Sequence, residues 1–194
     1  WRIIKEFSKR KLLYKDFKVV PYCSRCGTAL SSHELAQGYQ QVRERSVYVK
    51  FKLKSSQRLG TTQDVTENTY ILAWTTTPWT LPGNVALAVG KDIEYEMWKS
   101  GEEHLIIAAE CREDVGISGK PEIRGVLLGK SLVGLAYEPL FNVEELESDK
   151  KSHKVYDADF VSTQDGTGVV HTAVMYGEDD YNLGTKIGLP KFHT

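Results

Sequence analysis

The sequence predicts an α+β domain that is mostly β, with short strands in a barrel-like or sandwich-like arrangement and helices packed outside. Two observations lead to this fold class. Short apolar or alternating runs recur at close intervals between turn-forming residues, while few segments have helical periodicity. Many short strands with few helices are typical of closed or sandwiched β domains. Residues 1–45 differ in character, so we expect a connecting segment there and the main domain over residues 46–194.

The connecting segment begins with a predicted amphipathic helix over residues 1–13, where apolar residues stand near helical spacing with Lys and Arg between them. A tight CxxC knuckle follows at Cys23–Gly27, and then a polar stretch to about Gly38. The apolar positions of the helix are Trp1, Ile4, Phe7 and Leu12.

The main domain opens with a half-buried strand, because apolar residues alternate with basic and polar ones from Ser46 to Lys54. Acidic residues favour a helix start, so a last helix is expected to begin at Glu178. A charged loop is expected over residues 144–154, and a short helix from Ala109 to Val115, ending near Gly116. Further strands are predicted at residues 69–74, 86–89, 93–98, 104–109, 132–136, 155–161 and 169–172.

Composition and charge argue against a membrane-spanning chain and against a globally basic nucleic-acid-binding protein. The 194 residues are 41% hydrophobic and 26% charged, which is ordinary for a globular domain with its own core. A net charge of -1 gives no global positive field, so RNA contacts would need local basic patches, such as residues 9–18 and 50–58. No apolar run approaches the roughly 18 residues that span a bilayer. Three cysteines and a start at Trp1 suggest a cytoplasmic fragment of a longer polypeptide.

The first segment with chemical potential is WTTTPWTLPGN, from Trp74 to Asn84. Pro78 withholds a backbone donor and ends a ladder, and Pro82-Gly83 favours a turn. The run is therefore expected to form a rigid loop that presents hydroxyls and free N–H groups to one small volume, as an oxyanion or ribose site requires. Ordinary β-branched strand residues and a turn cap would explain the same pattern. The hydroxyls belong to Thr75, Thr76, Thr77 and Thr80.

The second segment is DGTGVVHTAVMYGEDDY, from Asp165 to Tyr181. A glycine turn feeds a short strand that ends in His171-Thr172, and an acidic helix start follows. A histidine facing carboxylates is a reasonable active-site arrangement. Asp180, in the first helical turn, is expected to stay ionised readily and to suit a substrate ammonium. Helix capping and a buried core histidine would also account for these residues.

Together and in this order, the two segments resemble the editing (CP1) domain of class I synthetases for branched aliphatic amino acids, in particular that of isoleucyl-tRNA synthetases. Thr77 favours the isoleucyl family, since valyl and leucyl relatives typically have arginine there. One departure is the run Val174-Met175-Tyr176, where many relatives continue with a proline and a small residue. No HIGH-like or KMSKS-like signature occurs, so the fragment is not expected to activate isoleucine. Other family-like stretches are residues 23–34, 46–51 and 129–141.

The resemblance implies a hydrolase that removes valine wrongly attached to tRNA(Ile), with valyl-adenylate as a further substrate. Asp180 would bind the α-ammonium, and His171 would line the side-chain pocket and exclude isoleucine. Positioned water and oxyanion stabilisation would suffice without a strong general base. The four threonines would surround the ester, the ribose and the water, and the supporting substrate-binding residues would be Trp79, Asn84 and Thr172.

The resemblance also implies partners. These are the acceptor end of tRNA(Ile) charged with valine and the remainder of a parent synthetase that ligates isoleucine using ATP. The domain is expected to be a monomer, away from membranes, and to need no cofactor for editing. Two alternatives remain open: a non-catalytic tRNA-binding module, and a valyl-type or leucyl-type editing domain.

Cys23 and Cys26 have the spacing of half a zinc knuckle. A structural zinc site needs four ligands, and the remaining cysteine, Cys111, lies far along the sequence. Relatives with this pair often complete the site with a second CxxC beyond the editing domain. The sequence therefore allows a structural zinc site in the parent protein or a free thiol pair in a turn.

Overall fold

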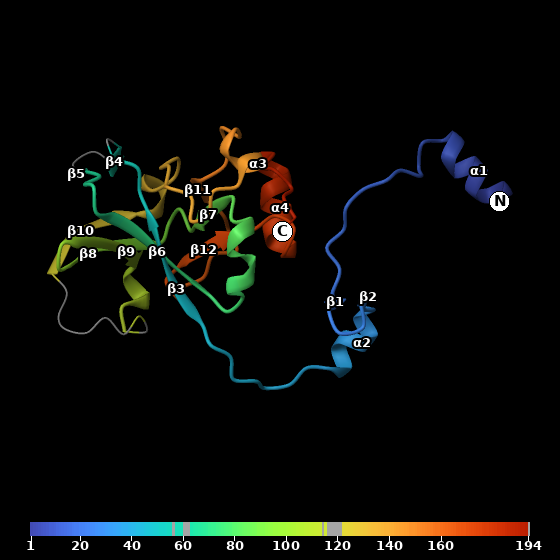
Figure 1. Ribbon diagram of the computed structural model, residues 1–194, viewed down its shortest axis with the longest axis horizontal. Coiled ribbons are helices and arrows are strands. Elements are labelled where there is room, and N and C mark those ends of the chain that lie inside the picture. Colours follow the sequence, from blue (N-terminus) through green and yellow to red (C-terminus); the bar gives the residue numbers. More distant parts are fainter. Residues whose placement is uncertain (56, 60–62, 114, 116–121, 194) are drawn as a thin grey trace. The chain divides into compact units, whose positions relative to one another are not determined.

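The computed structural model describes residues 1–55, 57–59, 63–113, 115 and 122–193 of the chain (Figure 1). The chain divides into two compact units, Trp1–Val42 and Arg43–Thr194. The sequence had suggested a division after residue 45, close to this boundary. Whether the two parts fold independently stays a prediction.

The first unit contains two short helices and one small hairpin. The polar stretch before Gly38, for which the sequence predicted no element, contains a helix that begins after Ser31. The Ser31 side chain accepts from the Glu34 N–H, and the Glu34 carboxylate accepts from the Ser31 N–H, a capping box that stabilises this helix start. The elements are α1 (Arg2–Lys9), β1 (Tyr22–Cys23), β2 (Thr28–Ala29) and α2 (Ser32–Gln37).

The second unit is built around a five-stranded sheet in the order β10-β8-β9-β6-β3. Neighbouring strands are antiparallel except β6 and β9, which are parallel. The order leaves β10 and β3 at the edges, so this sheet is open rather than a closed barrel. Its strands are β3 (Val47–Lys52), β6 (Thr69–Thr75), β8 (Glu94–Ser100), β9 (Glu103–Ala108) and β10 (Glu122–Leu128).

A three-stranded sheet in the order β11-β7-β12 packs against the large sheet, and β12 contacts β6 directly. Residues of both sheets, among them Phe51, Ile71, Leu87 and Val169, share the main hydrophobic core. The bounds are β7 (Ala86–Val89), β11 (Lys154–Asp157) and β12 (Val169–Thr172), with a small ribbon of β4 (Arg58–Leu59) and β5 (Gln63–Asp64).

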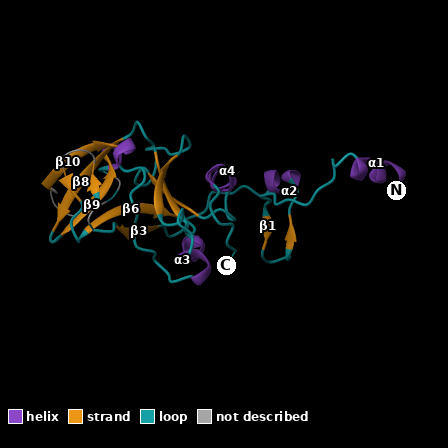
Figure 2. Ribbon diagram, turned by 90° about the horizontal axis from the view of Figure 1, so that it is seen from above, coloured by secondary structure: helices purple, strands orange, loops and turns teal. Residues whose placement is uncertain are grey.

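Helices border the three-stranded sheet on the side of the unit away from β10 (Figure 1, Figure 2). Leu183 of α4 packs on Ala88 of β7, and Leu146 of α3 packs near Ala86. The helices are α3 (Glu144–Glu147) and α4 (Glu178–Ile187), with 3-10 turns η1 (Pro78–Gly83), η2 (Ala109–Cys111) and η3 (Gly129–Ser131). The mostly β fold class with peripheral helices is thus confirmed, and barrel-like describes it loosely.

Most predicted strands are present, but three predicted elements are wrong. Residues 132–136 form no named strand, because Gly134 has a φ of 89° and interrupts the extended run; Leu132 and Leu135 are buried, but Val133 is 39% exposed. Strand β10 was not predicted from the sequence. The charged stretch 144–154 contains α3 rather than a loop alone. The predicted helix from Ala109 is a single 3-10 turn, and its end near Gly116 lies outside the described residues.

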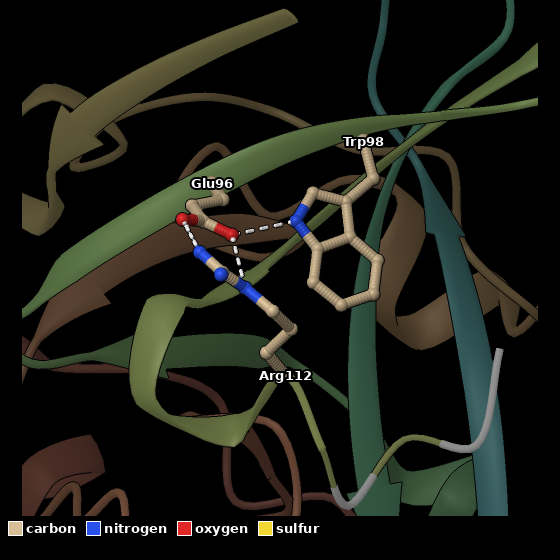
Figure 3. Close-up of polar contacts among 3 residues, drawn as sticks. All are labelled: Glu96, Trp98 and Arg112. Carbon is tan, nitrogen blue, oxygen red and sulfur yellow. Dashed lines mark hydrogen bonds and ion pairs between the residues drawn. The ribbon is translucent and has the colours of Figure 1, made fainter. Parts of the chain in front are cut away.

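A buried carboxylate ties η2 to the large sheet (Figure 3). Glu96 on β8 is only 4% exposed, and its Oε2 accepts from Trp98 Nε1 at 2.8 Å and from Arg112 Nε at 3.2 Å. The Arg112 guanidinium also contacts Glu96 Oε1, which gives a two-point ion pair. Buried charges are tolerated only when they are paired and hydrogen-bonded, and Glu96 meets both conditions.

We expect Arg112→Ala to lower the free energy of unfolding by about 1–3 kcal/mol, because Glu96 would keep only the indole N–H as a partner. Arg124→Ala is the matched control, since Arg124 pairs with Glu122 while both side chains are largely exposed. Exposed pairs contribute less than about 1 kcal/mol. Urea denaturation of both variants measures the difference, and equal losses would contradict a special role for the Glu96 cluster.

Candidate functional site

The threonine-rich segment leaves β6 and tightens at once into η1. Thr75 is the last residue of β6, and its Oγ1 accepts from the Thr77 N–H at 3.1 Å. Thr80 donates twice to the Thr77 carbonyl, from its N–H at 3.0 Å and from its hydroxyl at 2.8 Å. Pro78 opens the 3-10 turn, where its missing N–H costs nothing. The predicted rigid loop is present, although Pro82-Gly83 lies inside the 3-10 turn rather than in a separate one.

The second wall of the site comes from β12 and the start of α4. Because β12 packs against β6, His171 reaches the threonine loop, and its Nε2 lies 3.0 Å from Thr80 Oγ1. This contact joins two segments that are 91 residues apart in the sequence. His171 is buried, and burial lowers the pKa of its imidazole to about 4. The ring is therefore neutral at pH 7.

The contact with Thr80 favours one tautomer of that neutral ring. The Thr80 hydroxyl has one hydrogen and lies within hydrogen-bond distance of both the Thr77 carbonyl and His171 Nε2. When the hydrogen points to the carbonyl, the hydroxyl accepts from His171, and the ring proton is then on Nε2 and the lone pair on Nδ1. Nδ1 is buried and has no hydrogen-bond partner among the described residues. His171 is thus a neutral, oriented ring, not a charged group.

Asp180 lies in the first turn of α4, and its Oδ2 accepts from the Ala173 N–H at 3.4 Å. Burial raises the pKa of its carboxyl to about 6, an effect that the Ala173 N–H only partly offsets and that Asp179 reinforces. The expectation that the helix start would make Asp180 ionise readily is therefore wrong in direction, because loss of hydration outweighs the helix dipole. At pH 7 the carboxylate still predominates.

These groups line one cavity of about 260 Å³. Six predicted site residues meet there, four from the first segment and two from the second. Their roles stay predictions, but the structure brings them together as the sequence suggested. They are Thr75, Thr76, Thr77, Thr80, His171 and Asp180.

Three predicted substrate-binding residues do not line this cavity. The Trp79 side chain is 66% exposed. Asn84 is buried and serves the fold, since its Nδ2 donates to the Ala86 carbonyl at 2.9 Å and its Oδ1 accepts from Tyr137 at 2.6 Å. Thr172 is also buried, in the pairing of β12 with β7. Asn84 thus ties the end of η1 to β7 and Tyr137, and a contact with substrate stays a prediction.

The cavity is also lined by Trp74, Val170 and Tyr176, which were not predicted from the sequence. Trp74 directly precedes the threonine run, and Val170 precedes His171 on β12. Tyr176 belongs to the departure Val174-Met175-Tyr176, and its ring lies 5.6 Å from that of His193. A search for aromatic residues flanking each polar motif would have found Trp74 and Tyr176.

The CxxC pair forms a tight turn in the first unit. Cys23 Sγ accepts from the Cys26 N–H at 3.4 Å, and this contact lowers the pKa of Cys23. Two thiols with this geometry fit half of a tetrahedral zinc site. Among the described residues, no group of three or more candidate ligands gathers around a metal position. Zinc in a longer parent protein therefore stays a prediction.

Within the described part of the chain, every helix is too short or too polar to traverse a lipid bilayer.

Comparison with known proteins relates the whole chain to one group. The isoleucine–tRNA ligase of Clostridium novyi is 50% identical over 190 residues, which are 98% of this chain and 17% of that protein. The isoleucine–tRNA ligase of Thermus thermophilus is 43% identical over 194 residues, which are 100% of this chain and 18% of that protein. The chain thus spans less than a fifth of the length of these relatives. No family model matches the chain.

Solved structures relate the fold to synthetase editing domains. GlLeuRS-CP1 superposes with a TM-score of 0.58 over 76% of this chain and 66% of that chain, at 16% identity. The editing domain of the cytosolic leucyl-tRNA synthetase of P. knowlesi gives a TM-score of 0.54 over 73% of this chain and 62% of that chain, at 16% identity. The chain therefore belongs to the isoleucine–tRNA ligases, as a segment with the fold of the CP1 editing domain.

Proposed function

We propose that this domain hydrolyses the ester of valine wrongly attached to tRNA(Ile), with valyl-adenylate as a further substrate. One observation carries the proposal. The half-buried Asp180 carboxylate shares its cavity with threonine hydroxyls and a neutral histidine, and the described lining residues include no lysine or arginine. A carboxylate that is buried without a cation is costly, and the α-ammonium of an aminoacyl ester would supply the missing charge.

The threonine loop supplies groups suited to the reacting ester. Thr75, Thr76 and Thr77 line the cavity, and the loop that holds them is fixed by its own hydrogen bonds. Fixed hydroxyls and N–H groups can orient a water molecule and stabilise the oxyanion that forms when water attacks an ester. Water adds to the ester carbon, the ribose oxygen leaves with a proton, and free valine results. The reaction as proposed needs no cofactor.

His171 is suited to shape the pocket rather than to remove a strong proton. With a pKa near 4 it is a weak base, and its Nε2 is already hydrogen-bonded to Thr80. Its ring is held in one orientation, so it can limit the size of the substrate side chain. Isoleucine exceeds valine by one methylene, which a single pocket distinguishes by only about 1–3 kcal/mol, this pair being the usual worked example of that limit. A second, smaller pocket increases the overall selectivity.

The proposal includes partners that follow from membership in a longer ligase. The acceptor end of tRNA(Ile) would deliver the ester, and the remainder of the synthetase, working as a monomer in the cytoplasm, would attach isoleucine with ATP. A non-catalytic RNA-binding module is less well supported. Two lysines of the basic strand β3 are already paired, Lys50 with Glu103 and Lys52 with Glu138.

The direct test incubates the chain with valyl-tRNA(Ile) and isoleucyl-tRNA(Ile) and follows release of the amino acid. Faster cleavage of the valyl ester than in buffer, with the isoleucyl ester spared, supports the proposal. Retention of tRNA without cleavage of either ester would instead favour a binding module. Preferential cleavage of mischarged tRNA(Val) or tRNA(Leu) would favour a valyl-type or leucyl-type domain.

We expect Asp180→Asn to lower kcat/KM for valyl-tRNA(Ile) by roughly 30-fold to several thousand-fold. This range corresponds to the about 2–5 kcal/mol lost when one partner of a buried charge pair is removed. Asp179→Asn is the matched control, because Asp179 is the preceding residue of the same helical turn and lines a different cavity. Steady-state deacylation of both variants measures the effect, and similar losses in the two would refute an ammonium contact specific to Asp180.

His171→Ala should admit isoleucine, because the pocket loses a rigid ring. We expect the preference for the valyl over the isoleucyl ester to fall about tenfold or more. His171→Gln keeps most of the bulk and serves as the comparison. If isoleucyl-tRNA(Ile) stays equally protected in both variants, His171 does not exclude the larger side chain.

Asp180→Asn should also stabilise the folded chain at pH 7, by about 1–3 kcal/mol. The carboxyl has its ordinary pKa of 3.8 when unfolded and about 6 when folded, so ionisation destabilises the fold as pH rises through this range. Asparagine carries no such cost, and most of the gain should be lost by pH 4, where the folded carboxyl is neutral and the unfolded one is near the midpoint of its titration. His171 is present in both proteins, so its contribution to the pH dependence of stability cancels in the comparison. Urea denaturation at pH 7 and pH 4 measures the gain; an unchanged gain at pH 4 would contradict this cause.

A further inference from the structure

Helix α4 touches the segment that precedes it at a glycine. A Cβ on Gly184 would lie 2.4 Å from Val174 Cγ2 and 2.8 Å from Val174 Cγ1. Carbon atoms pack at about 3.5–4.0 Å, so no side chain fits at this position without movement. Both residues are buried, and Val174 is held in a cluster with Val85 and Ala86. The missing side chain therefore sets how closely α4 approaches Val174.

Gly184 is placed to affect Asp180. It follows Asp180 by four residues, so the two occupy the same face of α4 on successive turns. The segment before the helix contacts both turns, since the Ala173 N–H donates to Asp180 Oδ2 and the Val174 side chain meets Gly184. Through these two contacts, one face of α4 packs against Ala173 and Val174. Any displacement at Gly184 is transmitted along a rigid helix to Asp180.

We propose that Gly184 and Val174 are positioning residues whose close contact sets how deeply the Asp180 carboxylate lies in the cavity. Val174 belongs to the run Val174-Met175-Tyr176 that departs from the family pattern, and the contact gives this residue a role. The consequence for hydrolysis rests on the function proposed above. The placement of the carboxylate does not, and it can be measured without a substrate.

Gly184→Ala should move the helix face that carries Asp180 by roughly 1 Å, because the new methyl group must reach normal contact distance from Val174. The carboxylate would then be better hydrated. Alanine favours helix more than glycine does, so without the contact the same substitution would stabilise α4. The two readings predict opposite changes in stability.

The experiment is a carboxyl NMR titration of Asp180 in the full chain. The wild type should titrate near pH 6. In Gly184→Ala the pKa of Asp180 should be lower by about half a pH unit or more, because hydration favours the charged form. The titratable groups near Asp180 are His171 and Tyr176, which line the same cavity, and Asp179 on α4. All three are present in every variant, so a change in the Asp180 titration reports the position of the carboxylate.

Rescue separates positioning from general damage. Val174→Ala removes the two methyl groups that lie closest to a Cβ at Gly184 and leaves only Val174 Cβ, at 3.2 Å, so the double variant Val174→Ala/Gly184→Ala should have an Asp180 pKa close to that of Val174→Ala alone. Deacylation should follow the titration, with kcat/KM about tenfold lower in Gly184→Ala and restored in the double variant. Leu183→Ala is the control, because Leu183 packs on Ala88 and Ala158 instead. It should lower stability without changing the titration of Asp180.

An unchanged pKa of Asp180 in Gly184→Ala would overturn the inference, whether or not the chain cleaves aminoacyl esters. A lower pKa of Asp180 in Gly184→Ala that the double variant restores would support the inference. This holds even if the wild type proves inactive, in which case only the proposed function fails. If Gly184→Ala does not fold, Val174→Ile enlarges the same contact by one methylene. Val174→Ile should also lower the pKa of Asp180, and an unchanged pKa in this variant would equally overturn the inference.

Discussion

The hydrogen bond between His171 Nε2 and Thr80 Oγ1 is the point at which the two halves of the site meet. It exists because β12 packs against β6, which brings the end of one sheet to the loop that leaves the other. The Thr80 hydroxyl also lies 2.8 Å from the Thr77 carbonyl, and donation to that carbonyl favours a ring proton on Nε2. The orientation of the imidazole follows from the bond to Thr80, and Nδ1 has no hydrogen-bond partner among the described residues.

Burial shifts the pKa values of the two titratable groups of the cavity in opposite directions, for a single reason. It lowers the pKa of His171 to about 4 and raises that of Asp180 to about 6, because a low-dielectric site disfavours either charge. The result at neutral pH is a neutral ring beside a carboxylate that lacks a cation in the described lining. Such a site costs the empty protein stability, and under the proposed function the α-ammonium of the substrate would recover that cost.

The sequence predicted the strands that form the site with good accuracy, because their apolar runs are short and bounded by turn residues. Residues 86–89 and 169–172 form strands with the predicted bounds. It failed at residues 132–136, where Gly134 interrupts the extended run, and it did not predict the helix that the Ser31 cap begins. It also could not show that Asn84 and Thr172 lie outside the cavity lining, since a polar residue near a motif looks the same whether it faces a cavity or the core.

The sequence by itself determined the mostly β fold class, the family and the two segments that carry the polar groups, because these depend on local pattern and residue type. The tertiary structure alone decided which of those groups share a cavity and in which protonation state. Thr80 and His171 are brought together by sheet packing, and the depth of Asp180 is set where α4 touches Val174 through Gly184. Contacts and hydration between distant residues have no local signature, so these properties could only be read from the folded chain.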